Sequence, residues 1–386
     1  MPAPNVDWDE WEGFDPLNTN IPLSETEQAR VDRLMASIHR PIAAGDPRRH
    51  HYYPQSFLKR FGNDNAIGRV PIAEPHSHAV LRVSDAAVMK DLYTTIDKTV
   101  GETVAVEKVL AEVDGAAVQP LDRLAHGVLF PPQQRDREAL AIWLGMLHVR
   151  TPAQRRHMEA MADQAIKLQL SLVQDEASAH RFLEDWHGQT ATDSEARELL
   201  DSMDKLEGTE LVPHQNEFVM QMLDLGLRAS TLFIARHWAV VKCPANGPGL
   251  ALSDSPFRLI EHPENHRPLM GVGLATADEI WIPLDRHTLL IMHSNPGTGD
   301  RVIHLDSDDD ISALNQTIVD TARVEVFCHP DDSDNVATLT FQDPDRPFGR
   351  VSAGWPIAST DGMNGTVNRQ RHHRYRREAP PDPAES

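Results

Sequence analysis

Apolar residues recur at helical spacing through the first two thirds of the chain. The clearest case spans residues 133–149, where Leu140, Trp143, Leu144 and Leu147 follow the i, i+3, i+4, i+7 pattern of a helix with one buried face. Thr151 followed by Pro-Ala-Gln has the order of a helix start, with a capping hydroxyl, a proline in the first turn and a glutamine to close the box. Further helices are expected at 24–38, 99–113, 120–127 and in stretches up to about 236, with breaks near Gly188 and Pro213.

From Trp238 onward the pattern changes to short apolar runs separated by proline, glycine, asparagine and aspartate. These runs predict strands: HWAVVKC, GLALS, EIWIPL, HTLLIMH and RVIHL. Earlier in the chain, AIGRVPI and HAVLRVSD flank a turn-like PHS and predict a hairpin. A final helix is expected from Ile311 to about Val324. The fold class that follows is α+β, with a mainly helical N-terminal and central part and a later small mixed or antiparallel β-sheet.

The same pattern divides the chain into three segments. Residues 1–45 read as an acidic leader with a first helix. Residues 46–327 read as one domain, helical to about 236 and β-rich over 237–327. Residues 328–386 read as a C-terminal extension that ends in a basic and then proline-rich sequence, RQRHHRYRREAPPDPAES, of a composition typical of disorder.

Composition restricts the classes of function. The chain has 386 residues, 40% of them hydrophobic, which can support a core. Its apolar runs are shorter than a membrane span, and its first residues lack the order of a signal peptide, so we expect a cytoplasmic protein without membrane contact. The formal net charge of −21 argues against a surface that coats nucleic acid, although it leaves room for a local basic site. With only Cys243 and Cys328, no disulfide framework is expected.

The stretch HHYYPQSFLKRF combines polar and apolar residues in an order that predicts a strand followed by a helix. Pro54 fixes a backbone angle suited to a first helical turn and pushes Tyr53 toward an extended conformation. His51 and Tyr52 should then lie on an extended approach, with Gln55 in the first turn. This arrangement places polar groups near a helix N-terminus, where negative charge is favoured. The alternative is that His51 and Gln55 only hydrogen-bond the loop.

This stretch, with Leu58 and Phe61 after it, resembles the motif H-Y-x-P-Q-x-x-L-x-x-F of the microbial family called domain of unknown function 4238. Other stretches are similar to the family's segments in the same order over about residues 50–327: KDLYT, the glutamate-bearing EKVLAE, Arg150-Thr-Pro, the Ser-Asp-x-Pro turn in LSDSP and the Ile-Pro-Leu strand. One departure is His148, where the family pattern leads us to expect glutamine. The resemblance implies positions for a site rather than a mechanism.

Arg150 lies on the same stripe as Trp143 and Leu147 and should point inward, where its charge needs a carboxylate or a bound anion. Asp254 and Glu112 are the expected carboxylate partners. A structural ion pair and the capture of a phosphate or carboxylate are both open interpretations of Arg150. Asp254, after the strand GLAL, is either a turn residue or a general base or metal ligand, and Glu112 can also pair with Lys108 on the helix surface.

Two sequence motifs for metal binding are present only in part. Asp306, Asp308 and Asp310 resemble the start of an EF-hand loop, but Ile311 and Thr317 occupy the positions that need glycine and glutamate. His262 and His266 have the spacing of a zincin helix, but a proline follows the first histidine and the glutamate is missing. A divalent metal therefore stays open as a cofactor without an assigned ligand set.

Two hypotheses of different class follow from the sequence. In the first, the chain is a hydrolase that acts on a phosphate-containing substrate, either a small molecule or a nucleic acid. Its catalytic residues would be His51, Asp254 and Glu112, and its substrate-binding residues Gln55, Arg150 and Tyr52. In the second, the chain is a non-catalytic binding or regulatory module, and the same residues form a structural polar network. Neither oligomeric state nor the role of the basic tail follows from the sequence.

Overall fold

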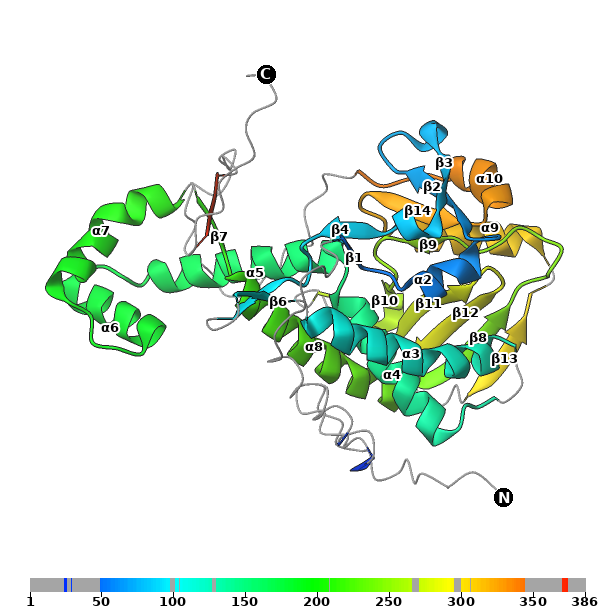
Figure 1. Ribbon diagram of the computed structural model, residues 1–386, viewed down its shortest axis with the longest axis horizontal. Coiled ribbons are helices and arrows are strands. Elements are labelled where there is room, and N and C mark those ends of the chain that lie inside the picture. Colours follow the sequence, from blue (N-terminus) through cyan, green and yellow to red (C-terminus); the bar gives the residue numbers. More distant parts are fainter. Residues whose placement is uncertain are drawn as a thin grey trace. The chain divides into compact units, whose positions relative to one another are not determined.

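The computed structural model describes residues 24, 25, 29, 49–97, 101–103, 105–126, 130–207, 209–265, 271–294, 300–305, 307–343 and 370–373. Contacts within the chain divide it into two compact units (Figure 1), one holding residues 1–154 and 219–354 and the other residues 155–218 and 355–386. The larger unit contains all the residues singled out above as candidates for a site. Most of the expected helix at 24–38 lies outside the described residues.

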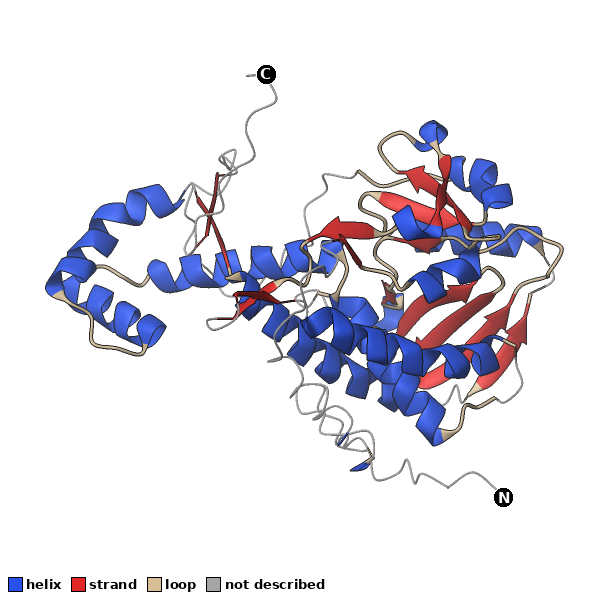
Figure 2. Cartoon of the chain, in the orientation of Figure 1, coloured by secondary structure: helices blue, strands red, loops and turns tan. Residues whose placement is uncertain are grey.

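A five-stranded mixed sheet forms one layer of the larger unit (Figure 2). Its order is β10 (Arg258–Ile260), β11 (Glu279–Asp285), β12 (Thr288–His293), β8 (His237–Lys242) and β13 (Arg301–His304). Neighbouring strands are antiparallel, except that β13 runs parallel to β8. Four of the predicted strands are confirmed here, because the runs HWAVVKC, EIWIPL, HTLLIMH and RVIHL form β8, β11, β12 and β13. β10 was not predicted, and the run GLALS contributes only a two-residue strand to another sheet. The α+β class with a later mixed sheet is also confirmed.

A second, four-stranded sheet joins the beginning of the domain to its end. The predicted hairpin is confirmed: β2 (Ala66–Pro71) pairs antiparallel with β3 (Ala79–Arg82). β2 also pairs with β14 (Glu325–Cys328), and β14 with β9 (Leu252–Ser253), both antiparallel. Short two-stranded ladders add β1 (Arg49–His51) with β4 (Val88–Lys90), and β5 (Thr95–Asp97) with β6 (Gly101–Thr103). His51 therefore lies on an extended strand, as Pro54 predicted.

Three long helices pack in the larger unit beside the five-stranded sheet (Figure 1): α3 (Ala105–Ala125), α4 (Gln134–Val149) and α8 (Gln215–Ala235), whose first residues belong to the smaller unit. α4 has the predicted bounds. α4 and α8 approach closely at two glycines, since a Cβ on Gly145 would lie 2.1 Å from the carbonyl oxygen of Gly226. Among the described helices, α8 alone has the length and apolar composition of a membrane span, and 44% of that window is buried within the structure.

α3 corrects the prediction of two helices at 99–113 and 120–127. Residues Gly101–Thr103 form strand β6 instead of a first helical turn, and the helix then runs unbroken through Pro120 to Ala125. Pro120 removes one backbone hydrogen bond, but the buried face formed by Val113, Ala117, Leu121 and Leu124 continues on both sides of it. Burial of this continuous apolar face outweighs the local cost of the proline.

The proline-started helix is shorter than predicted. α2 (Gln55–Leu58) has one turn, continues as the 3-10 helix η2 (Lys59–Phe61) and ends at Gly62. Pro54 is its N-cap residue, with an extended ψ of 138°, and does not occupy the first helical position. Phe57 anchors this segment, because its ring packs edge-on against both Phe61 and Trp143. A helix of one turn has too small a dipole to hold an anion by itself.

The predicted helix from Ile311 to about Val324 corresponds to α9 (Asp308–Val319), which begins and ends earlier than predicted. Ser307 caps its N-terminus. The folded chain continues beyond the expected boundary at 327 through η7 (Pro330–Asp332) and α10 (Ser333–Ala337), whose Val336 is buried in the core. The remaining 3-10 turns are η3 (Pro75–Ser77), η4 (Val83–Asp85) and η5 (Pro263–Asn265).

The smaller unit holds most of α5 (Pro152–Leu170), together with α6 (Glu176–His187), α7 (Asp193–Glu207), β7 (Thr209–Val212) and β15 (Gln370–His373), which pairs parallel with β7. The predicted start of α5 is confirmed, because the backbone N–H of Gln154 donates to Thr151 Oγ1 at 3.2 Å. The break at Gly188 is also confirmed: this residue ends α6 with a left-handed φ of 64°, which glycine adopts without a steric cost.

Candidate functional site

Arg150 is the centre of the candidate site. It follows the last residue of α4 and is fully buried, with 2% of its surface exposed. Its Nη1 donates to Oδ2 of Asp114 on α3 at 3.0 Å, so the buried charge has one carboxylate partner. The expected partners were Asp254 and Glu112, and Asp114 takes their place. Burial opposes the charge, but the attraction and the hydrogen bond of Asp114 leave the pKa of Arg150 above its usual value.

The opposite edge of this guanidinium is uncommitted. Arg150 Nε and Nη2 are both buried, and neither has a hydrogen-bond partner among the described residues. The same edge of arginine makes the two-pronged ion pairs elsewhere in this chain. Arg123 uses Nε and Nη2 to hold Asp136 at 2.7 Å each, and Arg286 holds Asp332 at 2.9 and 3.0 Å. Arg150 therefore presents a buried fork of the geometry that binds a carboxylate or a phosphate.

A second carboxylate, that of Glu107, lies on α3 like Asp114 and interacts electrostatically with this arginine. Glu107 lies two turns before Asp114 on α3, so the two side chains share one face. Glu107 is half-buried, and burial raises its pKa to about 7, against the opposing attraction of Arg150 and with a further increase from Asp114. Its Oε2 and Oδ1 of Asp114 also lack hydrogen-bond partners within the described chain. Glu107 can accordingly exchange a proton near neutral pH.

Tyr93 and His50 hold the backbone around Arg150. The Tyr93 hydroxyl donates to the carbonyl of Arg150 at 3.3 Å, and the Tyr93 backbone N–H donates to Nδ1 of His50 at 2.9 Å. The two rings stack with centroids 5.5 Å apart, and both residues have no exposed surface. Burial raises the pKa of Tyr93 well above its usual value, so its hydroxyl stays protonated and serves as a donor. This packing fixes the start of the Arg150-Thr-Pro segment.

His51 and Gln55 form a separate pair at the surface. His51 Nδ1 lies 3.1 Å from the carbonyl of Ala86, which requires a proton on this nitrogen, and its Nε2 then accepts from the Gln55 amide at 3.1 Å. Burial lowers the pKa of His51, while the Ala86 carbonyl opposes the shift and Arg49 adds to it. The imidazole is therefore neutral at pH 7, with both nitrogens already engaged within the loop.

The tyrosines of the motif lie in the core. The Tyr52 hydroxyl donates to Oε1 of Glu325 at 2.8 Å, and Arg69 holds the other oxygen of that carboxylate. The Tyr53 hydroxyl donates to the carbonyl of Ser253. Burial raises the pKa of both tyrosines well above the usual value. These bonds tie the first motif to the strands β9 and β14 of the four-stranded sheet.

Asp254 fastens the turn that the Ser-Asp-x-Pro motif predicted. It is buried, and its two carboxylate oxygens accept from the backbone N–H groups of Arg323 at 2.8 Å and Val324 at 2.9 Å. Its own N–H donates to the carbonyl of Glu325 at 3.1 Å. The carboxylate thus completes the backbone hydrogen bonding next to β14, and His51 takes its hydrogen bonds from other residues.

The structure brings only part of the expected set together. Arg150 lies inside the cluster, whereas Glu112 is exposed on α3, five residues and about 140° round the helix from Glu107. Glu107 and Asp114 were missed as site residues, although their seven-residue spacing within an apolar helix face was a usable signal. Among the described residues, no group of three or more histidine, cysteine, aspartate or glutamate side chains could hold a metal ion.

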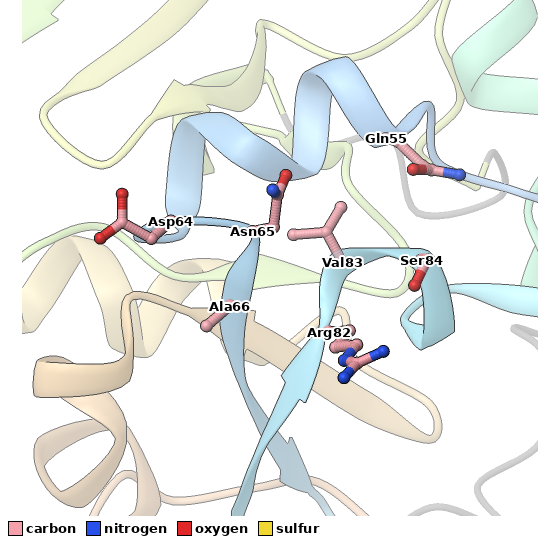
Figure 3. Close-up of a pocket in the computed structure, with 7 residues that line it drawn as sticks. All are labelled: Gln55, Asp64, Asn65, Ala66, Arg82, Val83 and Ser84. Carbon is pink, nitrogen blue, oxygen red and sulfur yellow. The ribbon is translucent and has the colours of Figure 1, made fainter.

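Gln55 also borders a hollow of about 530 Å³ beside α2 (Figure 3). The other lining residues come from the turn before β2 and from the end of β3 and η4: Asp64, Asn65, Ala66, Arg82, Val83 and Ser84. In Figure 3 the Gln55 side chain lies at the far end of the helix from Asp64 and Asn65. Arg150, Glu107 and Asp114 do not line this hollow, so it is separate from the cluster.

Comparison with known proteins gives a family and no function. Neither a search of the curated proteins nor one of the solved structures found a match. A family model described as "Protein of unknown function (DUF4238)" matches residues 49–332, which is more than half of the chain and includes every residue of the Arg150 cluster. The chain therefore belongs to the DUF4238 family, as the opening motif and the Ser-Asp-x-Pro turn indicated.

Proposed function

We propose that this protein is a hydrolase that acts on a phosphodiester, with the phosphate held by Arg150 and Glu107 supplying a proton. The observation that carries the proposal is the buried Nε and Nη2 edge of Arg150, which has no hydrogen-bond partner in the described chain. Arg150 also interacts electrostatically with Glu107, whose pKa lies near 7. Carboxylates and phosphates satisfy this edge, because two of their oxygens accept two parallel hydrogen bonds from the planar guanidinium.

The charges of the cluster favour a ligand with a single negative charge. Arg150 and Asp114 neutralise each other, so an ionised Glu107 leaves the site with one net negative charge. When a monoanion binds and Glu107 takes up a proton, the total charge stays the same. A phosphodiester carries one negative charge at neutral pH, whereas a phosphomonoester carries close to two and would add repulsion. Binding of one anion should therefore be coupled to uptake of one proton.

In this proposal the protonated Glu107 acts as the general acid. In the proposed step a water oxygen forms a bond to phosphorus while the bond to the leaving alcohol oxygen breaks, and that oxygen takes the Glu107 proton. The proton of the attacking water passes to solvent, and Glu107 is reprotonated before the next turnover. An acid with a pKa near 7 is well matched to this exchange at neutral pH. Asp114 holds the guanidinium in place, and Tyr93 fixes its backbone.

Hydrolysis of bis(4-nitrophenyl) phosphate, followed by release of nitrophenolate, tests the proposal. We expect the wild type to cleave this diester faster than the monoester 4-nitrophenyl phosphate. On diphenyl phosphate, whose phenol leaving group needs a proton whereas nitrophenolate does not, Glu107→Gln should lose about 100-fold or more in kcat, as expected for loss of an acid catalyst. Glu112→Gln, on the exposed side of the same helix, is the matched control and should keep wild-type activity. Equal activity in Glu107→Gln and the wild type would refute the assignment.

A second candidate function is a non-catalytic binding module. It is favoured by Asp254, whose carboxylate is held by two backbone N–H groups, and by His51, whose two nitrogens are engaged with Ala86 and Gln55. In this case the wild type would bind a phosphodiester such as dimethyl phosphate through Arg150 but would not cleave the chromogenic diester. Binding without turnover therefore separates the two candidates.

A further inference from the structure

The larger unit has a second hollow, of about 920 Å³, away from the Arg150 cluster. Its wall is formed by the α2–η2 segment, the C-terminal end of α3, the end of β8, the turn between β11 and β12, and β13. A volume of this size accommodates a small organic ligand, for which sites of roughly 300–1,000 Å³ are usual.

Basic side chains dominate this wall. Four basic side chains line the hollow, Lys59, Arg60, Lys242 and Arg286, against the two carboxylates of Asp122 and Asp285. Three histidines add further donors: His126, His287 and His304. The whole chain carries a formal net charge of −21, so a net positive hollow stands out from its surroundings. Such a concentration of positive charge attracts anionic ligands and holds them by charge-assisted hydrogen bonds.

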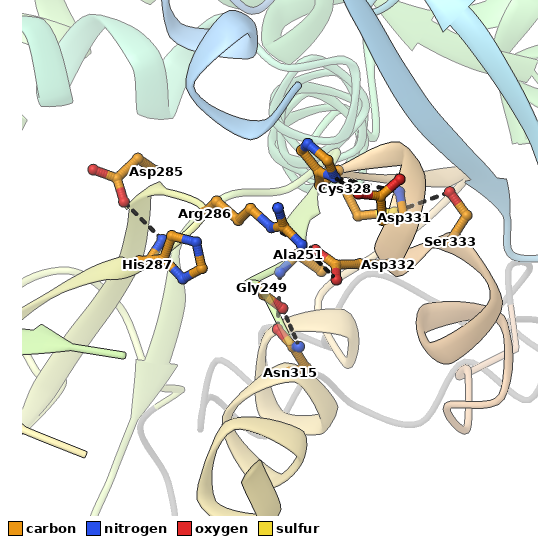
Figure 4. Close-up of polar contacts among 11 residues, drawn as sticks. Gly249, Ala251, Asp285, Arg286, His287, Asn315, Cys328, Asp331, Asp332 and Ser333 are labelled. Carbon is orange, nitrogen blue, oxygen red and sulfur yellow. Dashed lines mark hydrogen bonds and ion pairs between the residues drawn. The ribbon is translucent and has the colours of Figure 1, made fainter. Parts of the chain in front are cut away.

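The cations differ in how far other residues already use them. Arg60 pairs with Asp122, and Arg286 makes its two-pronged pair with Asp332 (Figure 4). Lys242 has no carboxylate partner in the described chain: its Nζ donates to the carbonyl of Ala125 and, at 3.1 Å, to Thr288 Oγ1. Burial lowers its pKa, although Asp285 opposes the shift.

Lys59 and His287 also have polar atoms that other residues do not use for an ion pair or a hydrogen bond. Lys59 is exposed and makes no ion pair among the residues that the structure describes. His287 is half-buried on the β11–β12 turn, where Asp285 accepts from its backbone N–H, and its buried Nδ1 lacks a hydrogen-bond partner in the described chain (Figure 4). Together with Lys242, these two residues offer donors from three separate elements to one ligand.

Backbone hydrogen bonds hold the wall together before any ligand arrives. The N–H of Arg286 donates to the carbonyl of Arg60 at 3.1 Å, which joins the β11–β12 turn to η2. The N–H of Cys243 donates to the carbonyl of His287 at 2.9 Å, which joins the end of β8 to the same turn. A wall fixed in this way loses little freedom on binding, which favours affinity.

Apolar side chains share the wall with the cations. Val118 and Ala125 of α3 and Val302 of β13 line the same hollow. Pockets that combine a few convergent charges with apolar surface suit ligands that have both an anionic and an apolar part. An inorganic anion would use only the charges of the wall and leave its apolar surface without a partner.

We infer that this hollow binds a small molecule with a diphosphate group and an apolar, ring-sized part, independently of the Arg150 site. Lys59, Lys242 and His287 contact the diphosphate, and the valines of α3 and β13 contact the apolar part. A diphosphate carries at least two negative charges and several acceptor oxygens, so it can use all three donors at once. Arg60 and Arg286 shape the wall while they stay paired with their aspartates.

Calorimetric titration of the full chain with ADP, pyrophosphate and adenosine tests this inference. We expect ADP to bind more tightly than pyrophosphate or adenosine, because only ADP uses both kinds of contact. Lys59→Glu should weaken ADP binding by about tenfold or more, since it replaces an attraction by a repulsion. Arg228→Glu, an equal charge change at a residue on α8 that is 73% exposed, is the matched control and should leave the affinity within about twofold.

Two further variants make the result decisive. Lys242→Met should weaken ADP binding by a similar factor, with a thermal melt recorded to show that the chain still folds. Arg150→Lys should leave ADP binding unchanged, so that failure of the proposed phosphodiesterase site would not affect this result. Absence of ADP binding to the wild type, an equal effect of Lys59→Glu and Arg228→Glu, or loss of ADP binding in Arg150→Lys would each overturn the inference.

Discussion

Replacing Glu107 with glutamine should stabilise the larger unit at pH 8 and have much less effect at pH 5. In the folded chain the Glu107 pKa is about 7, against an ordinary value of 4.5, so the folded state retains a proton that the unfolded state releases. Wild-type stability therefore falls as pH rises from about 4.5 to about 7 and then levels off. The neutral amide of glutamine has no such dependence, so the variant gains its advantage over the same interval.

The size of the effect follows from the two pKa values. At about 1.36 kcal/mol per pH unit, the difference between 4.5 and about 7 corresponds to roughly 3 kcal/mol of folding free energy. Glu107 is only half-buried, and water screens part of this penalty, so we expect about 1–2 kcal/mol at pH 8. The folded-state pKa of Glu107 already includes the attraction between its ionised carboxylate and Arg150, so this attraction needs no separate correction.

Urea unfolding at pH 5, 6, 7 and 8 measures this difference, with tryptophan fluorescence as the signal. The fully buried Trp143 and Trp238 both lie in the larger unit and report its unfolding. Glu112→Gln, on the exposed side of α3, is the control and should follow the wild type at every pH. A Glu107→Gln variant that is less stable than the wild type at pH 8 would show that the ionised glutamate is paired in the folded state and would refute the reasoning.

Three further substitutions test the packing around the site by thermal or urea unfolding. Asp254→Ala leaves the backbone N–H groups of Arg323 and Val324 without their carboxylate acceptor and should cost about 2–4 kcal/mol; unchanged stability would argue against a structural role. Gly145→Ala places a methyl group against the carbonyl of Gly226 and should cost about 1–3 kcal/mol, and a neutral result would contradict the close helix contact. Thr151→Ala removes the hydrogen bond to Gln154 and should cost about 1 kcal/mol, whereas Thr151→Ser should restore most of it.

Local sequence signals predicted the elements whose causes lie within a few residues. The Thr-Pro-Ala-Gln order gave the start of α5 correctly, because the cap is a bond between Thr151 and Gln154. The strands β8, β11, β12 and β13 were also predictable, since their apolar runs are separated by strong turn residues, whereas the short β10 was missed. Pro120 was misread as a boundary because the local cost of a proline is visible in the sequence, whereas the packing that compensates it is not.

Contacts between distant segments were beyond this kind of reasoning. Nothing local to β2 or β14 indicates that these strands pair, because more than 250 residues separate them in the sequence, as between Arg69 and Glu325. Arg150 could be predicted to point inward, but its partner could not be chosen among several carboxylates. Asp254 and Glu112 were named as partners although Asp114 pairs with Arg150, because the phase of α3 relative to α4 depends on how the two helices pack.

Binding of dimethyl phosphate to the wild type and to Arg150→Lys tests the central claim most directly, which is that the Nε and Nη2 edge of Arg150 holds an oxyanion. Lysine keeps the charge beside Asp114 but lacks the fork. Calorimetry should show tighter binding to the wild type at pH 6 than at pH 8, with proton uptake on binding at pH 8, where Glu107 is ionised beforehand. Arg150→Lys should lose about tenfold or more in affinity at an unchanged melting temperature. Equal affinity of the two proteins would contradict the account.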